Sequence, residues 1–233
     1  ATENYGPAPP RSPSFGVFNR EFLAEREGFS MLVLESQDAE ADAVAFREAG
    51  IGDFDPFRFE RDATLANGET ARVAFSIAFA KDAAPARAAF FTCRQHTPEK
   101  FWNPAFQRHA NAAATPGGVV LVAENPTDHH IFLSAFVGER DLLATSTGIT
   151  VPTSRGTIQV MDPAAYRIHF NATPPSIAAG LTLAALRFEV ADLATTRDVL
   201  ARSGKPLVER MGRLVVPPEA LHGAALIFEK PER

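Results

Sequence analysis

The side chains best suited to chemistry lie in residues 93–113, CRQHTPEKFWNPAFQRHANAA. This stretch holds the only cysteine and the only tryptophan of the chain, and two of its six histidines. Histidine can ligate a metal or exchange a proton near neutral pH, and tryptophan can stack on a planar ligand. The candidates are His96 as a metal ligand, His109 as an acid or base, and Trp102, Asn103 and Gln107 as ligand contacts.

A structural explanation of the same stretch is the alternative. Phe101, Trp102 and Phe106 could pack as plugs between two parts of the fold, and His109 could bond to backbone. The sequence alone leaves both explanations open.

His96 ends a strand-like run, residues 89–96. Side chains alternate between the two faces of a strand, so Thr92, Arg94 and His96 are predicted to share one face. Arg94 is therefore a further candidate for ligand contact. Cys93 points the other way, which argues against a Cys–His nucleophilic pair.

Composition narrows the classes of protein. The chain is 45% hydrophobic and 22% charged with a formal charge of -5, which suits a globular fold and gives no electrostatic reason to expect nucleic acid. A single cysteine cannot form an intrachain disulfide, which predicts a reducing, cytoplasmic location. The sequence has no apolar run of about 18 residues, no signal peptide and no phosphate loop, so neither a membrane partner nor a nucleotide cofactor is expected.

A strand, a helix and a glycine turn recur three times along the chain. Each first strand closes on a glutamate and each helix stops at a glycine, at nearly constant spacing: Glu35 and Gly50, Glu124 and Gly138, Glu189 and Gly204. Further strand-like runs follow each helix, so the repeated unit is βαβββ. The repetition favours a structural role for these glutamates at the strand-to-helix junction; the alternative for Glu35 is proton transfer.

The repeats divide the chain into units joined by less regular segments. The predicted boundaries are a lead-in at 1–27, a module at 28–97, an aromatic connector at 98–117, and modules at 118–176 and 177–233. Units of this length rarely bury their apolar face alone, so the modules are expected to pair.

Three motifs carry a resemblance to a known family: GFSMLVLES at 28–36, FWNPAFQRH at 101–109 and GRLVVPPEALHGAALIFE at 212–229. With them the chain resembles the vicinal oxygen chelate superfamily, and within it the glyoxalase-like domain proteins, over about residues 15–230. The resemblance implies an α+β fold whose βαβββ modules pair into curved, cup-like mixed sheets around a metal and a small substrate. Because such modules usually come in even numbers, a partner for 28–97 is expected upstream of residue 1; the alternative is that 1–27 replaces it.

The resemblance also implies metal ligands on the concave faces of first and last strands. None of the first strands has a histidine on its concave face. In the first repeat, one face of this strand carries Met31, Val33 and Glu35. The last strands offer His96 in the first repeat, Gln159 in the second and Glu229 in the third, where Glu229 is more simply a surface acid at a strand end. A catalytic metal commonly takes three protein ligands, so the partners of His96 would come from the upstream module.

Two functions follow from the resemblance. The first is an enzyme, an isomerase, lyase or dioxygenase, that uses iron, manganese, zinc or nickel on a small oxygenated organic molecule while His109 or Glu35 moves a proton. The second is a metal-free protein that binds or sequesters a small molecule in the same cup. The lack of first-strand histidines favours the second function and His96 favours the first. A homodimer could close an open half-cup in either case.

Overall fold

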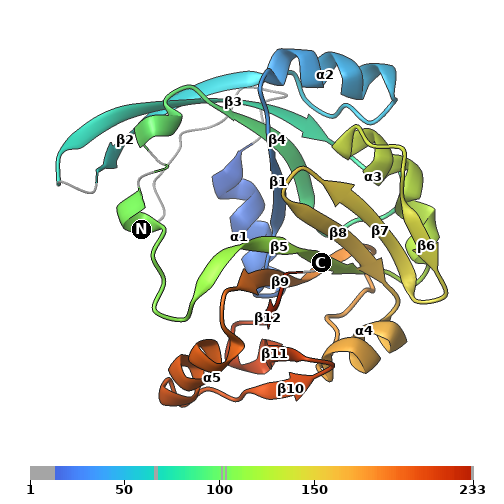
Figure 1. Ribbon diagram of the computed structural model, residues 1–233. Coiled ribbons are helices and arrows are strands. Elements are labelled where there is room, and N and C mark those ends of the chain that lie inside the picture. The colour runs from blue at the N-terminus through green and yellow to red at the C-terminus, as the bar shows by residue number, and fades with distance from the viewer. Residues whose placement is uncertain (1–13, 66–67, 101, 103, 232–233) are drawn as a thin grey trace.

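The computed structural model describes residues 14–65, 68–100, 102 and 104–231. Two curved sheets dominate it (Figure 1): one of four strands in the order β1-β4-β3-β2, and one of eight in the order β10-β11-β12-β9-β5-β8-β7-β6. Both sheets mix parallel and antiparallel neighbours. The predicted α+β class with curved mixed sheets is confirmed.

The four-stranded sheet has the predicted βαβββ order. Its elements are β1 (Met31–Glu35), α2 (Ala39–Glu48), β2 (Phe57–Thr64), β3 (Thr70–Ala80) and β4 (Ala89–Gln95). Asp38 caps the start of α2, because its carboxylate accepts hydrogen bonds from the backbone N–H groups of Glu40 and Ala41.

Two further runs of this kind build the eight-stranded sheet. The first comprises β5 (Ala113–Val122), α3 (His130–Val137), β6 (Leu143–Thr145), β7 (Gly148–Thr153) and β8 (Gly156–Met161). The second comprises β9 (Thr182–Val190), α5 (Leu193–Arg202), β10 (Val208–Arg210), β11 (Arg213–Val216) and β12 (Ala225–Glu229). Antiparallel pairing of β5 with β9 joins them. Since β5 begins at Ala113, part of the predicted connector is strand.

Short 3-10 helices occupy several connections. They are η1 (Pro98–Lys100), η2 (Pro104–Phe106), η3 (Pro126–His129) and η4 (Pro218–Ala220).

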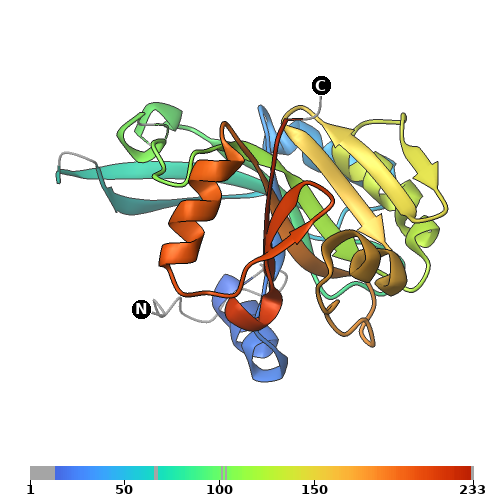
Figure 2. The ribbon, with the colours of Figure 1, turned by 60° about the horizontal axis from the view of Figure 1, so that its bottom comes forward.

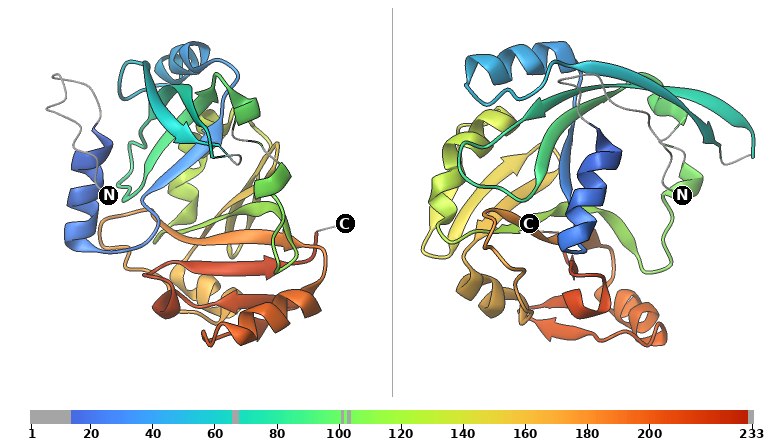
Figure 3. Two further views of the ribbon diagram at one scale, coloured as in Figure 1. Left: turned by 90° about the vertical axis from the view of Figure 1, so that its left-hand side faces the viewer. Right: turned by 180° about the vertical axis from the view of Figure 1, so that it is seen from behind.

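Two helices differ from the sequence prediction. The lead-in contains α1 (Phe15–Glu25), and α4 (Pro163–Phe170) follows β8. The ring of Phe15 lies 5.6 Å from that of Phe91 on the face of the first sheet opposite α2, and Figure 3 shows α1 under this sheet. Tyr166 and Phe170 of α4 are buried in the same way on the eight-stranded sheet, opposite α3 and α5. Each curved sheet therefore carries one helix on its concave face.

The two sheets share one core at their junction. Helices α2 and α3 meet there, with the rings of Phe46 and Phe136 5.9 Å apart and those of Phe90 and Phe132 4.9 Å apart. A buried pair, His129 Nδ1 to Asp82 Oδ2 at 2.7 Å, crosses the same junction. None of the helices in the described part of the chain is both long and apolar enough for a membrane span.

Candidate functional site

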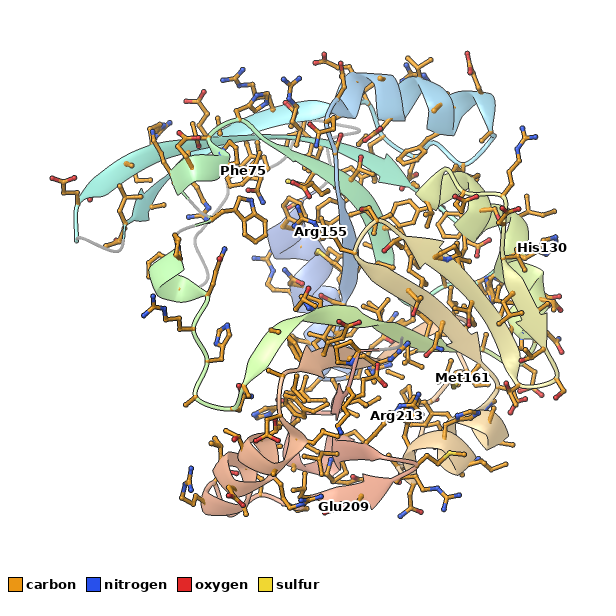
Figure 4. The ribbon with its side chains drawn as sticks, in the orientation of Figure 1. Phe75, His130, Arg155, Met161, Glu209 and Arg213 are labelled. Atoms are coloured by element: carbon orange, nitrogen blue, oxygen red, sulfur yellow. The ribbon has the colours of Figure 1, made fainter. Side chains whose placement is uncertain are left out.

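A cavity of about 480 Å³ opens where the edge of the first sheet meets the second sheet. Its wall contains parts of β1 and β4, Trp102, the start of β5 and the β7–β8 turn. In Figure 4, Arg155 of that turn lies between the first sheet above and β5 below. Segments far apart in the sequence therefore converge on one hollow.

Arg155 contacts two side chains from other parts of the chain at this cavity. Glu35 Oε2 at the end of β1 lies 2.9 Å from Arg155 Nη2, and Arg155 Cζ lies 5.6 Å from the centre of the Trp102 ring. The guanidinium thus sits between a carboxylate and an aromatic face, an arrangement that favours a cation. All three side chains are exposed to solvent, so a ligand entering the cavity can reach them.

The position of Arg155 is fixed by its backbone. The hydroxyl of Thr153 donates to the carbonyl of Gly156 at 2.9 Å and accepts from the N–H of Arg155 at 3.3 Å, which closes the turn. Gly156 has a φ of +121°, and a Cβ on it would lie 2.5 Å from the carbonyl oxygen of Gly117. Only glycine allows this close approach of β8 to β5.

Gln95 and Cys93 of β4 complete the polar lining. Strand register pairs Glu35 with Cys93, so Glu35, Cys93 and Gln95 share the concave face of the first sheet. The Oε1 atom of Gln95 is buried and has no hydrogen-bond partner in the described part of the chain, so it is available to a donor on a ligand. Burial raises the pKa of the Cys93 thiol, which keeps it protonated and weakly nucleophilic.

Arg94 and His96 lie on the other face of the same sheet. The register of β4 with β3 pairs Arg94 with Ser76, and His96 Nε2 lies 2.8 Å from the Ser76 hydroxyl. The expectation that His96 and Glu35 both face the concave side is therefore corrected. The reason is the register, which sets Cys93 and not Arg94 beside Glu35.

The other candidates of the aromatic segment are not gathered with Trp102. Gln107 and His109 are exposed on the chain that leads to β5, and neither lines the cavity. Asn103 lies outside the described residues. Trp102 and Glu35 are thus the predicted site residues that the structure brings together, while Arg155 and Gln95 join them without having been predicted.

The donor set does not fit a metal with three protein ligands. Over the described residues, no group of three or more histidine, cysteine, aspartate and glutamate side chains is placed to hold an ion. Glu35 is paired with Arg155, and His96 is bonded to Ser76 on the opposite face. We therefore derive no chemical step through a metal, and the role of His96 as a ligand stays a prediction.

The Glu35–Arg155 pair should contribute little to stability. Its side chains are 40% and 62% exposed, and exposed ion pairs are typically worth about 0–1 kcal/mol. We expect Arg155→Ala to lower the free energy of unfolding by less than about 1 kcal/mol in urea denaturation. A loss several times larger would mean that Arg155 supports the fold rather than a ligand.

A second charged cluster lies on the concave face of the eight-stranded sheet. Arg187 Nε and Arg213 Nε each donate to the carboxylate of Glu229 at 2.6 Å, and Arg187 also donates to the Thr157 hydroxyl at 3.0 Å. Glu229 is only 5% exposed, so its prediction as a surface acid was wrong. Its charge is balanced within the protein by two guanidinium groups.

The described residues form curved mixed sheets from βαβββ runs, with a hollow between the two sheets. Residues 3–137 of the 233 match the family model described as glyoxalase-like domain, more than half of the chain. The chain therefore belongs to the glyoxalase-like domain family.

One of the similar solved structures supports a shared fold. A hypothetical protein from Staphylococcus aureus superposes with a TM-score of 0.57 and 11% identity, covering 92% of this chain and 71% of that one. Methylmalonyl-CoA epimerase from Mycobacterium tuberculosis has a TM-score of 0.40 and 15% sequence identity, and the match covers 54% of this chain and 93% of that one. A xylose isomerase-like TIM barrel/4-hydroxyphenylpyruvate dioxygenase fusion protein has a TM-score of 0.43 and 11% sequence identity, and the match covers 93% of this chain and 40% of that one. The first likeness concerns fold alone, and the two lower scores add nothing to it. No curated protein matches the sequence.

Proposed function

We propose that the cavity around Arg155 binds a small oxygenated organic molecule that carries a carboxylate on a planar, apolar body. The single observation that carries this proposal is the contact of Glu35, Arg155 and Trp102 across two sheets at one cavity. The cavity lies within the range typical of ligand sites, roughly 300–1,000 Å³.

Each lining group has a place in this proposal. The guanidinium of Arg155 can turn from Glu35 to a ligand carboxylate with two parallel hydrogen bonds. The face of Trp102 and the side chains of Val33 and Leu186 offer an apolar surface to the body of the molecule. Gln95 Oε1 can accept a hydrogen bond from a hydroxyl group.

Glu35 is the group best placed for proton transfer in this cavity. Its carboxylate lines the cavity beside Arg155, where it can accept a proton from a bound hydroxyl or an acidic carbon. Turning Arg155 to a ligand would release Glu35 for this role. Binding is the primary function proposed, and chemistry at Glu35 is its extension.

Titration of the only tryptophan tests the proposal. We expect benzoate to change the fluorescence of Trp102 with saturation, because the ligand would lie against the indole ring. Arg155→Ala should weaken the binding by about tenfold, the cost of a lost charge-assisted hydrogen bond. Benzamide, which has the same ring without the charge, should bind the wild type about as weakly as benzoate binds the variant.

Arg94→Ala provides the matched control. It removes the same charge from β4, where Arg94 lies on the face opposite Cys93 and Gln95 and does not line the cavity, so benzoate affinity should not change. If Arg94→Ala and Arg155→Ala lose the same benzoate affinity, the effect comes from the net charge of the protein and the proposal is overturned. Manganese, iron and zinc are added in separate titrations; binding of benzoate only in the presence of one of them would favour the metal-assisted alternative.

A further inference from the structure

A second, smaller cavity lies on the concave face of the eight-stranded sheet. It has a volume of about 240 Å³ and is enclosed by strands β6 to β8, the end of α4 and the β10–β11 turn. Figure 2 shows α4 beside the β10–β11 hairpin, and the Nε of Arg210 on that hairpin donates to the carbonyl of Ile168 in α4 at 2.9 Å. Figure 4 shows Arg213 near Met161, and both line this cavity.

Hydrogen-bond donors converge on this cavity from separate elements. Thr150 and Gln159 are register partners on β7 and β8, so their side chains lie side by side on the concave face. His169 reaches the cavity from α4 and Arg213 from β11. Within the described residues, no side-chain hydrogen bond engages Thr150, Gln159 or His169.

Charge at the cavity is positive. Arg213 uses its Nε for Glu229, whose carboxylate Arg187 also occupies, and its two terminal nitrogens have no partner among the residues described. The ionisable groups of the lining are His169 and Arg213, and no carboxylate is among the described lining residues. Burial is the main cause that lowers the pKa of His169, and the positive charges of Arg213 and Arg210 lower it further.

We propose that Arg213, His169, Gln159 and Thr150 form a binding site for a small oxyanion of the phosphate or sulfate type. The site is distinct from the cavity around Arg155, because no residue lines both: Thr157 and Ile158 of β8 line that cavity, and Gln159, Val160 and Met161 line this one. Each of the four side chains can donate to an anionic oxygen. A neutral histidine donates one such bond, and a protonated histidine adds a charge.

Sulfate is the probe, because its charge does not change near neutral pH. It is titrated against chloride at constant ionic strength, with the side-chain amide resonances of Gln159 as the site-specific readout. We expect saturable shifts of these resonances in the wild type and no change in the fluorescence of Trp102. Thr150→Val, which removes one hydroxyl without changing shape, should weaken sulfate binding by about three- to tenfold.

Gln159→Glu is the decisive variant. Because it lacks the side-chain amide, its sulfate binding is measured through the backbone resonances of β8. It places a carboxylate among the donors and leaves the Arg213–Glu229 pair intact, so sulfate affinity should fall by at least about tenfold. Gln95→Glu makes the same change in the other cavity and should leave sulfate binding unaltered. If Gln159→Glu does not fold, His169→Gln takes its place with the same expected direction. Undiminished sulfate binding in these variants, or no saturable shift in the wild type, would overturn the site.

Discussion

Glu229→Ala should lower the free energy of unfolding by about 3–5 kcal/mol, because it breaks a buried ion pair. Arg187 is 4% exposed and directs both Nε and Nη2 at Glu229, at 2.6 Å and 2.5 Å. Removal of the carboxylate takes away the buried acceptor that both of these nitrogen atoms face. The Thr157 hydroxyl, which also accepts a hydrogen bond from Arg187, is neutral and cannot replace the charge.

Urea denaturation of matched variants measures this effect. Glu229→Gln keeps the shape of the side chain and one acceptor oxygen. Its free energy of unfolding should therefore lie between those of the wild type and Glu229→Ala. Glu35→Ala removes a carboxylate that also contacts an arginine but is 40% exposed, and it should cost no more than about 1 kcal/mol. Equal costs for Glu229→Ala and Glu35→Ala would show that water reaches Arg187 readily, and the account of a buried charge cluster would fail.

Repeated local signals made most of the fold predictable. Asp38 and Asp192 cap α2 and α5, and Gly138 ends α3 with a φ of +75°, as its place in the repeat predicts. These signals act over a few residues, so a single sequence contains them in full. Helix α4 has such a signal too, because Asp162 caps it and Pro163 stands at its first turn. Helix α1 is harder to infer, since its burial depends on Phe rings of a sheet formed much later in the chain.

The candidate site was predictable only in part, because it depends on register and on distant segments. Alternation along β4 correctly separates His96 from Cys93, but it cannot say which of the two shares a face with Glu35. That depends on how β1 and β4 are aligned. Arg155 comes from the turn of another repeat, so neither spacing nor periodicity links it to Trp102.

Gly156→Ala is expected to weaken benzoate binding by about tenfold, as Arg155→Ala does, and to destabilise the fold by about 3 kcal/mol, although Gly156 itself does not line the cavity. The added Cβ would lie 2.5 Å from the oxygen and 2.7 Å from the carbon of the Gly117 carbonyl, and the φ of +121° is itself unfavourable for alanine. Both obstacles are backbone, so no side-chain rotation relieves them. The β7–β8 turn must shift, and Arg155 shifts with it, away from Glu35 and Trp102.

Gly138→Ala separates this effect from the general cost of a left-handed alanine. Gly138 has a φ of +75° at the end of α3, but a Cβ there would meet nothing within 4 Å. Gly138→Ala should lower the free energy of unfolding by about 1 kcal/mol and retain benzoate binding. Binding is measured through Trp102 fluorescence, without urea and at a temperature where both variants are folded. If Gly156→Ala binds benzoate like Gly138→Ala, the position of the turn does not control the site, and Arg155 must reach its ligand by flexibility instead of by placement.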